Sequence, residues 1–162
     1  MDEFQVLASG NILVGDGIRS IGQVLTEKIR GTKKEVSIVT YNIGQQESML
    51  LPLLENCLRR GILVTIIYNK MDTRSRLTKK LIALSSDYEN LRIYEFSKKG
   101  ELLHAKIFVF DLKEAIIGSA NFSSMAMINN HELGVLIRGK KLISVVEAVS
   151  RLQQKSKKIS SS

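Results

Sequence analysis

Apolar runs rich in β-branched residues alternate along the chain with longer segments in which apolar residues recur every three or four positions. The short runs predict strands, and the segments with helical spacing predict amphipathic helices. The run at 62–68 is almost continuously apolar, as expected of a strand buried on both faces of a mainly parallel sheet. In the first half of the chain, strands are predicted at 12–14, 35–43, 62–68 and 91–96, and helices at 16–30, 46–60 and 73–86.

The pattern changes in the second half, where strands are predicted at 104–111, 114–120 and 131–138. The two-residue connection at 112–113 has the length of an antiparallel hairpin. A last helix is predicted at 140–154. Strands that alternate with helices and then form a hairpin indicate an α/β domain. Its β-sheet is expected to be mixed, mostly parallel, and flanked by helices on both faces.

A length of 162 residues fits one domain with its own core. We expect this domain to cover residues 1–150, followed by a basic, serine-rich and flexible tail at 151–162. Cys57 is the single cysteine, which excludes an internal disulfide, and no apolar run approaches the roughly 20 residues that span a bilayer. The acidic beginning lacks the features of a signal peptide. These observations predict a cytoplasmic protein without a membrane segment, and they leave open whether the chain is one domain of a longer protein.

The formal net charge of +8 is concentrated in two segments. Residues 69–80 hold five cations and one acid, residues 151–162 hold four cations and no acid, and the other 15 cations and 15 acids balance. A solvated helix face and a soluble tail would show the same charge, but it is also typical of a protein that binds a polyanion such as nucleic acid or anionic lipid. The residues predicted to bind nucleic acid are Lys70, Arg74, Arg76, Lys79 and Lys80.

The candidate chemistry lies in the strands of the second half. Residues two apart on a strand project to the same side, so His104 and Lys106 are expected side by side at the start of one strand. Ser119 and Asn121, again two apart, follow Gly118 at the end of the next strand, where glycine lets another backbone approach closely. If the two strands are neighbours, an imidazole, an ammonium, a hydroxyl and an amide converge on one concave site.

These groups suit the cleavage of a phosphodiester. A neutral imidazole can attack phosphorus and form a covalent phosphohistidine, which divides the displacement into two steps. The Lys106 ammonium supplies positive charge, and Ser119 and Asn121 supply neutral donors to the phosphoryl oxygens. Glu132 is the candidate carboxylate that fixes the tautomer of His104. The sequence therefore predicts a catalytic site in which His104 is the nucleophile.

Neither a metal nor another cofactor is expected. The two histidines and one cysteine lack the spacing of metal ligands, and there is no D-x-D or H-E-x-x-H cluster. Gly15–Asp16–Gly17 lacks the rest of a nucleotide-binding fingerprint and is interpreted as a turn with a helix cap.

The spacing of these residues also resembles a known signature. H-A-K at 104–106, then Asp111 after four residues and G-S-A-N at 118–121 after six more, is similar to the HxK(x)4D(x)6GSxN motif of the phospholipase D superfamily. N-H-E at 130–132 resembles the trailing Asn-x-Glu of that family. The resemblance covers about residues 10–140 and implies the fold and the phosphodiesterase activity of the family. Asp111 lies on the opposite strand face from His104 by alternation, so Asp111 and Gly118 are interpreted as structural parts of the motif.

Members of this family use one histidine as nucleophile and a second, from another copy of the motif, as general acid. This chain holds one copy, and His131 is not in an H-x-K context. The resemblance to single-motif members, which are small bacterial-type nucleases, implies a homodimer with its active site at the two-fold interface. A two-fold axis through the site would give each phosphate one neutral and one protonated histidine.

Three functions remain open. The first is an endonuclease that cleaves DNA or RNA, with low sequence specificity because no base-reading motif is evident. The second is a phospholipid-cleaving or phosphatidyl-transferring enzyme, although no helix combines a bulky apolar face with a basic one. The third is an inactive nucleic-acid-binding module, which the intact motif argues against.

Overall fold

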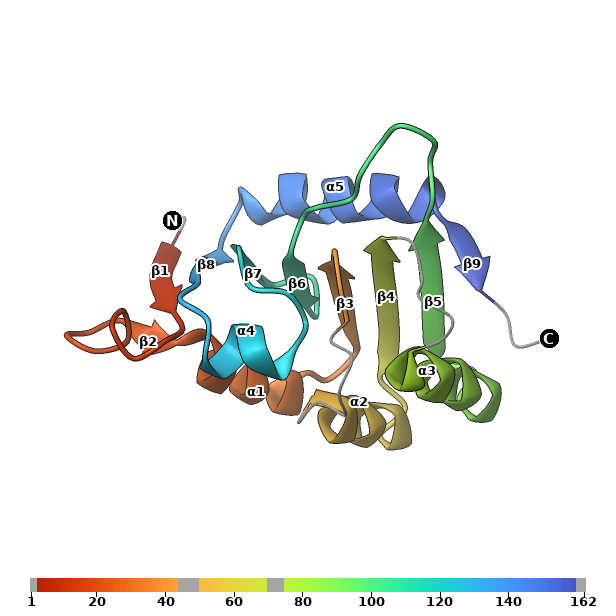
Figure 1. Ribbon diagram of the computed structural model, residues 1–162, viewed down its shortest axis with the longest axis horizontal. Coiled ribbons are helices and arrows are strands. Elements are labelled where there is room, and N and C mark those ends of the chain that lie inside the picture. Colours follow the sequence, from red (N-terminus) through yellow and green to blue (C-terminus); the bar gives the residue numbers. More distant parts are fainter. Residues whose placement is uncertain (1–2, 44–49, 70–74, 160–162) are drawn as a thin grey trace.

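The computed structural model describes residues 3–43, 50–69 and 75–159, which form one nine-stranded sheet and five helices (Figure 1). The strands are β1 (Glu3–Ala8), β2 (Arg19–Ser20), β3 (Glu35–Thr40), β4 (Leu63–Asn69), β5 (Leu91–Phe96), β6 (Ile107–Phe110), β7 (Glu114–Gly118), β8 (Leu133–Arg138) and β9 (Lys157–Ile159). The helices are α1 (Ile21–Gly31), α2 (Leu50–Arg59), α3 (Arg76–Asp87), α4 (Ser124–Ile128) and α5 (Leu142–Gln154). Within the described ranges, none of these helices is long and apolar enough to cross a bilayer.

The strands lie in the order β2-β1-β8-β7-β6-β3-β4-β5-β9. The pairs β1–β2, β3–β4 and β4–β5 are parallel, and the other neighbouring pairs are antiparallel. The predicted α/β class with a mixed sheet is confirmed, but the sheet is mostly antiparallel rather than mostly parallel. The difference has two causes. Strands β6, β7 and β8 follow one another in antiparallel pairs. Strands β1 and β9, which the hydrophobic pattern did not predict, add two further antiparallel pairs, β1–β8 and β5–β9.

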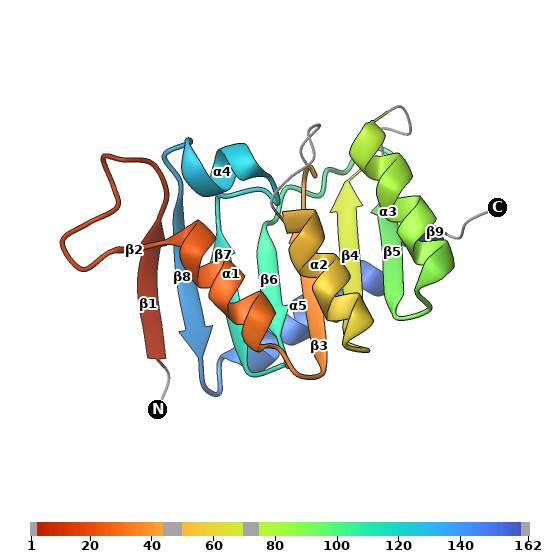
Figure 2. The same ribbon diagram turned by 90° about the horizontal axis from the view of Figure 1, so that it is seen from below.

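Helices cover both faces of the sheet, as predicted (Figure 2). Helices α1, α2 and α3 pack on one face, where Leu25, Leu54 and Leu81 join the larger core cluster. Helix α5 packs on the other face and contributes Leu142 and Val149 to a second cluster. The central strands are therefore buried from both sides, which explains the continuous apolar run in β4.

Serine caps decide where α1, α3 and α4 begin. The Ser20 side chain accepts a hydrogen bond of 3.4 Å from the backbone N–H of Gln23, so α1 begins at Ile21 rather than at residue 16. The residues before it form turns instead of the strand predicted at 12–14, and Ile12 is 80% exposed. Ser75 caps α3 in the same way. The beginnings of the helices predicted at 46–60 and 73–86 lie outside the described residues.

Strands at both ends of the described chain extend the sheet. Near the beginning, β1 pairs with β8 from Glu3↔Arg138 to Ala8↔Leu133. Near the end, α5 continues through Gln154, and β9 pairs with β5. The segment expected to be a flexible tail from residue 151 therefore carries regular structure as far as Ile159.

Candidate active site

The residues of the predicted site lie at one edge of the sheet. The carboxyl ends of β3 and β7 meet the amino ends of β6 and β8 there, because β6 runs antiparallel to β3 and β7, and β8 runs antiparallel to β7. His104 and Lys106 lie just before β6, Ser119 and Asn121 follow β7, and Glu132 precedes β8. Pairing across the sheet thus brings together residues from three separate segments.

His104 and Lys106 contact each other directly. Lys106 Nζ lies 2.9 Å from His104 Nδ1 and 3.2 Å from Nε2, and it donates a 2.7 Å hydrogen bond to the backbone carbonyl of His104. The Lys106 side chain is buried, at 5% exposure, whereas His104 is exposed. An ammonium group can only donate, so the imidazole nitrogen that it contacts must carry a lone pair. The arrangement presents an imidazole to solvent with a positive charge directly beside it.

The charge of Lys106 is affected by its surroundings in two ways. Burial lowers the pKa of the Lys106 ammonium below the ordinary lysine value, because the charged form loses water. The negative charge of Glu132 acts in the opposite direction and raises this pKa in part. Glu132 therefore belongs to the electrostatic environment of Lys106.

The Glu132 carboxylate accepts its side-chain hydrogen bonds from Ser119 and Asn130. Ser119 Oγ donates to Oε2, and Asn130 Nδ2 donates to Oε1 at 3.3 Å. In the part of the chain that the structure describes, His104 is not among the hydrogen-bond partners of Glu132. The tautomer-fixing contact predicted between these two residues is thus not made within one chain, where Lys106 and Tyr41 contact the imidazole instead.

The close approach of β7 and β8 holds Ser119 in place. A Cβ atom on Gly118 would lie 2.4 Å from the backbone oxygen of Leu133, so only glycine fits at this position. The next residue, Ser119, donates its backbone N–H to the same oxygen at 2.9 Å. Its side-chain oxygen accepts a 3.2 Å hydrogen bond from the backbone N–H of Leu133. The Ser119 hydroxyl is therefore fixed between β8 and Glu132.

The end of β3 contributes residues that the motif did not reveal. Thr40 is fully buried, and its Oγ1 lies 2.9 Å from the backbone oxygen of Asn42 and 3.4 Å from Asn121 Oδ1. Asn121 Oδ1 also accepts a 3.3 Å hydrogen bond from the backbone N–H of Asn42. The ring of Tyr41 lies 5.0 Å from that of His104. The signal in the sequence was that polar residues end an otherwise apolar strand, and such positions are common at functional sites.

Asp111 lies at the opposite edge of the sheet and binds backbone there. Its carboxylate accepts hydrogen bonds from the backbone N–H groups of Lys33, Lys34 and Glu35, at 3.0, 2.7 and 3.1 Å. Burial raises the pKa of Asp111, but these three donors and the positive charge of Lys113 together outweigh it, and the pKa lies below the ordinary value. Asp111 and Leu112 both have positive φ, 50° and 55°, as the tight turns of hairpins require. Asp111 thus links the β6–β7 turn to the loop before β3.

Two of the five cations predicted to bind nucleic acid, Lys70 and Arg74, lie outside the described residues. Arg76, Lys79 and Lys80 lie on α3. Arg76 and Lys79 are exposed, and Lys80 is partly buried. The amino end of α3 lies at the same edge of the sheet as the carboxyl end of β4 (Figure 2). Because β4 is parallel to β3, this is also the edge that carries His104.

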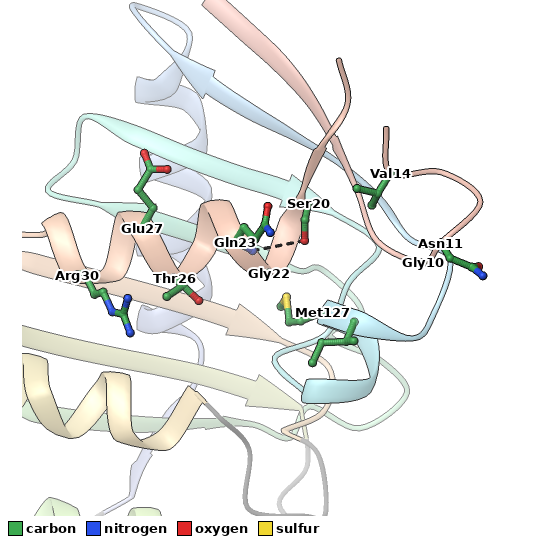
Figure 3. A pocket seen from close by; sticks show the side chains of 11 residues that line it. Gly10, Asn11, Val14, Ser20, Gly22, Gln23, Thr26, Glu27, Arg30 and Met127 are labelled. Atoms are coloured by element: carbon green, nitrogen blue, oxygen red, sulfur yellow. Dashed lines mark hydrogen bonds between the residues drawn. The ribbon is translucent and has the colours of Figure 1, made fainter. Parts of the chain in front are cut away.

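A separate pocket of about 880 Å³ lies between the β1–β2 loop, α1 and α4 (Figure 3). Gln23, Thr26 and Arg30 of α1 and Met127 of α4 line it. None of the predicted catalytic residues is among those that line this pocket. Among the residues that the structure describes, no three His, Cys, Asp or Glu side chains are grouped so that they could hold a metal ion.

Comparison with known proteins identifies relatives of this chain. The family described as "Cardiolipin synthase, PLD-like domain" matches residues 25–153. The DISARM protein DrmC of Bacillus paralicheniformis is 26% identical over 138 residues, which cover 83% of this chain and 57% of that protein. A phospholipase D of Rickettsia conorii is 25% identical over 111 residues, covering 68% of this chain and 53% of that protein. The chain spans a little over half the length of these curated relatives.

A solved structure shares the fold along the whole chain. Nuc from Salmonella typhimurium, described as a phospholipase D family member, superposes with a TM-score of 0.75 at 19% identity and covers 99% of both chains. Such an identity shows the fold alone, but the family match at 25–153 includes every motif residue from His104 to Glu132. The chain therefore belongs to the phospholipase D superfamily, whose enzymes act on phosphodiester bonds.

Proposed function

We propose that this chain is a metal-independent endonuclease that cleaves DNA or RNA through a covalent phosphohistidine on His104 and is active as a homodimer. The observation that carries the proposal is the buried Lys106 ammonium, 2.9 Å from a ring nitrogen of the exposed His104. This pair offers a nucleophile and a positive charge at one point of the surface, which is what attack on an anionic phosphodiester requires.

In the first step, phosphoryl oxygens compete with the imidazole for the Lys106 ammonium. The ring nitrogen that is released attacks phosphorus, and the bond from phosphorus to the leaving oxygen breaks as the new P–N bond forms. The leaving oxygen takes a proton from the partner's His104, which acts as general acid. The Asn121 amide donates to the phosphoryl oxygens and stabilises the charge that develops there. The Ser119 hydroxyl does the same by exchanging its hydrogen bond to Glu132 for one to the substrate.

In the second step, water attacks the phosphohistidine. The partner's His104, now neutral, takes a proton from the water, the P–N bond breaks, and a phosphate monoester leaves. One His104 thus acts as nucleophile and then as leaving group, while the partner's His104 acts first as acid and then as base, so both are needed. One chain supplies a single His104, which is the reason for proposing a dimer with the site on its two-fold axis.

Exposed cations on α3 support a nucleic-acid substrate. Arg76 and Lys79 are exposed on α3, which begins at the same edge of the sheet as the catalytic residues (Figure 2). Contacts between such cations and phosphates would add affinity that does not depend on sequence. A phospholipid substrate is the second candidate, because a matched relative is named phospholipase D.

The test is cleavage of a plasmid and of a labelled single-stranded oligonucleotide in excess EDTA. We expect both to be cut, and we expect His104→Ala to abolish cleavage. His131→Ala is the matched control, since it removes the other histidine of the chain, which is exposed and lies outside the H-x-K motif. Complete loss of wild-type cleavage in EDTA would refute the metal-independent mechanism. Labelled protein that is stable in alkali and labile in acid would identify the phosphohistidine.

The same preparation separates the alternatives. Hydrolysis of phosphatidylglycerol vesicles with no cleavage of nucleic acid would select the phospholipid reaction. Binding of nucleic acid without turnover, equal in the wild type and in His104→Ala, would select an inactive module.

The dimer is tested by mixing subunits. If both histidines of a site are needed, an excess of His104→Ala chains that exchange into dimers lowers wild-type activity in proportion to the heterodimer formed. Sedimentation under the assay conditions gives the mass. Full activity of a species with monomer mass would refute the shared site.

A further inference from the structure

Tyr41 lies directly beside the proposed nucleophile. Its ring centroid is 5.0 Å from that of His104, with 49° between the ring planes, and Lys106 Nζ lies 5.8 Å from the Tyr41 centroid. The contact with His104 does not bury the side chain, which remains 37% exposed. A ligand whose phosphate reached His104 would therefore meet an accessible aromatic surface next to it.

Few other aromatic rings are accessible. The nine phenylalanine and tyrosine residues of the chain all lie in the part that the structure describes, and only Phe4 and Tyr41 are exposed. Phe4 is near the start of β1, paired with Ile137, whereas the catalytic edge is at the other end of that strand, where Ala8 pairs with Leu133. Tyr41 is thus the one exposed phenylalanine or tyrosine among the described residues at the catalytic edge.

The backbone that carries Tyr41 is held on both sides. The preceding residue, Thr40, is fully buried and accepts a 3.1 Å hydrogen bond from the backbone N–H of Phe122. The following residue, Asn42, donates its backbone N–H to Asn121 Oδ1. A ring on such a backbone is already positioned before a ligand binds, so that less conformational entropy is lost on binding.

We propose that Tyr41 is a specificity-determining residue, the surface on which a nucleobase next to the scissile phosphate stacks. Every nucleobase has an aromatic face, so stacking on Tyr41 would add affinity without selecting a sequence. Bases within a duplex already stack on one another and would have to leave the helix to reach the ring. The proposal rests on the proposed nuclease function and makes single-stranded nucleic acid the preferred substrate class.

The test uses a single-stranded oligonucleotide with one cleavable phosphodiester, the other linkages being uncharged methylphosphonates. Three forms are compared: both flanking bases present, the 5′ base replaced by an abasic sugar analogue, or the 3′ base replaced. Each is cleaved by the wild type, by Tyr41→Phe, which keeps the ring, and by Tyr41→Leu, which fills similar space without one. We expect Tyr41→Leu to lose about 5- to 100-fold in kcat/KM on the intact form, mainly through KM, and Tyr41→Phe to stay within about twofold.

The abasic forms decide the interpretation. If Tyr41 stacks on a base, the wild type loses as much kcat/KM on one of the abasic forms as Tyr41→Leu loses on the intact form. Tyr41→Leu then cleaves that abasic form and the intact form equally well. An equal loss for Tyr41→Leu on all three forms, carried by kcat, would overturn the proposal and make Tyr41 a positioning residue for His104. No loss on any form would overturn it as well. All rates are referred to the concentration of folded protein measured by circular dichroism, so incomplete folding cannot imitate either result.

If the chain is not a nuclease, the assay gives a different result. In that case the wild type leaves all three forms intact, or cleaves them no faster than His104→Ala does. The wild type could instead cleave an intact duplex as fast as the single strand, with Tyr41→Leu lowering both rates alike. That result would reject only the preference for single-stranded nucleic acid.

Discussion

The hydroxyl of Thr40 accepts a 3.1 Å hydrogen bond from the backbone N–H of Phe122, 82 residues later in the chain. It joins the end of β3 to the turn that carries Asn121. The same hydroxyl lies 3.4 Å from Asn121 Oδ1. A buried residue that touches no substrate thus positions an amide proposed to bind the phosphoryl group.

We therefore expect Thr40→Val, which keeps the shape but removes the hydroxyl, to lower kcat by about 10- to 100-fold, because the turn that carries the Asn121 amide loses its hydrogen bond to Thr40. It should also destabilise the protein by about 1–3 kcal/mol, since the buried N–H of Phe122 loses its acceptor. Thr40→Ser keeps the hydroxyl and is the control. Steady-state kinetics and denaturant unfolding measure the two effects. Equal losses in both variants would contradict a role for the Thr40 hydrogen bonds.

Glu132 should control the pH range in which Lys106 keeps its charge. Burial lowers the pKa of Lys106 and Glu132 partly opposes this, so Glu132→Gln should lower the pKa further. Because the Lys106 amine must be protonated to bind phosphoryl oxygens, the alkaline limb of the kcat/KM profile should move to lower pH. Glu147→Gln, on the outer surface of α5, is the control for a lost carboxylate. An unchanged alkaline limb, whatever the overall rate, would contradict this role.

Asp111 should stabilise the fold only while it is ionised. Its pKa is lowered in the folded protein, so its stabilising contribution is complete above the ordinary aspartate pKa of about 4 and is lost as the pH falls through the lowered value. We expect Asp111→Asn, which tolerates the positive φ, to lower the unfolding free energy at neutral pH by about 1–2 kcal/mol. The difference from the wild type should shrink in acid. Urea unfolding at several pH values measures it, and a difference independent of pH would count against the charge.

Lys79 should contribute to the salt dependence of nucleic-acid binding. If its ammonium contacts one phosphate, Lys79→Gln should reduce the slope of log K against log salt by about 0.7 for single strands. Lys33→Gln is the matched control, because Lys33 is also an exposed lysine and lies at the opposite edge of the sheet. Fluorescence anisotropy of a labelled oligonucleotide over a salt series gives the slope. The same slope for the wild type and Lys79→Gln would show that Lys79 does not contact a phosphate.

The sequence by itself determined the features that depend on short-range periodicity. The α/β class follows from apolar spacing, and most predicted strands and helices overlap the observed ones. The neighbouring positions of His104 and Lys106 could be predicted because residues two apart on an extended chain point the same way. The motif spacing also led to the family, since it extends over one continuous segment.

Only the tertiary structure decided which segments become neighbours. Whether strands pair in parallel or antiparallel depends on partners far along the chain, so β1, β9 and the mostly antiparallel sheet could not be predicted from local patterns. For the same reason the motif did not reveal Thr40 or Tyr41, which reach the site through the pairing of β3 with β6. Hydrogen bonds and ring contacts form between groups that are close in space, and separation along the chain does not limit them once the sheet has brought the groups together.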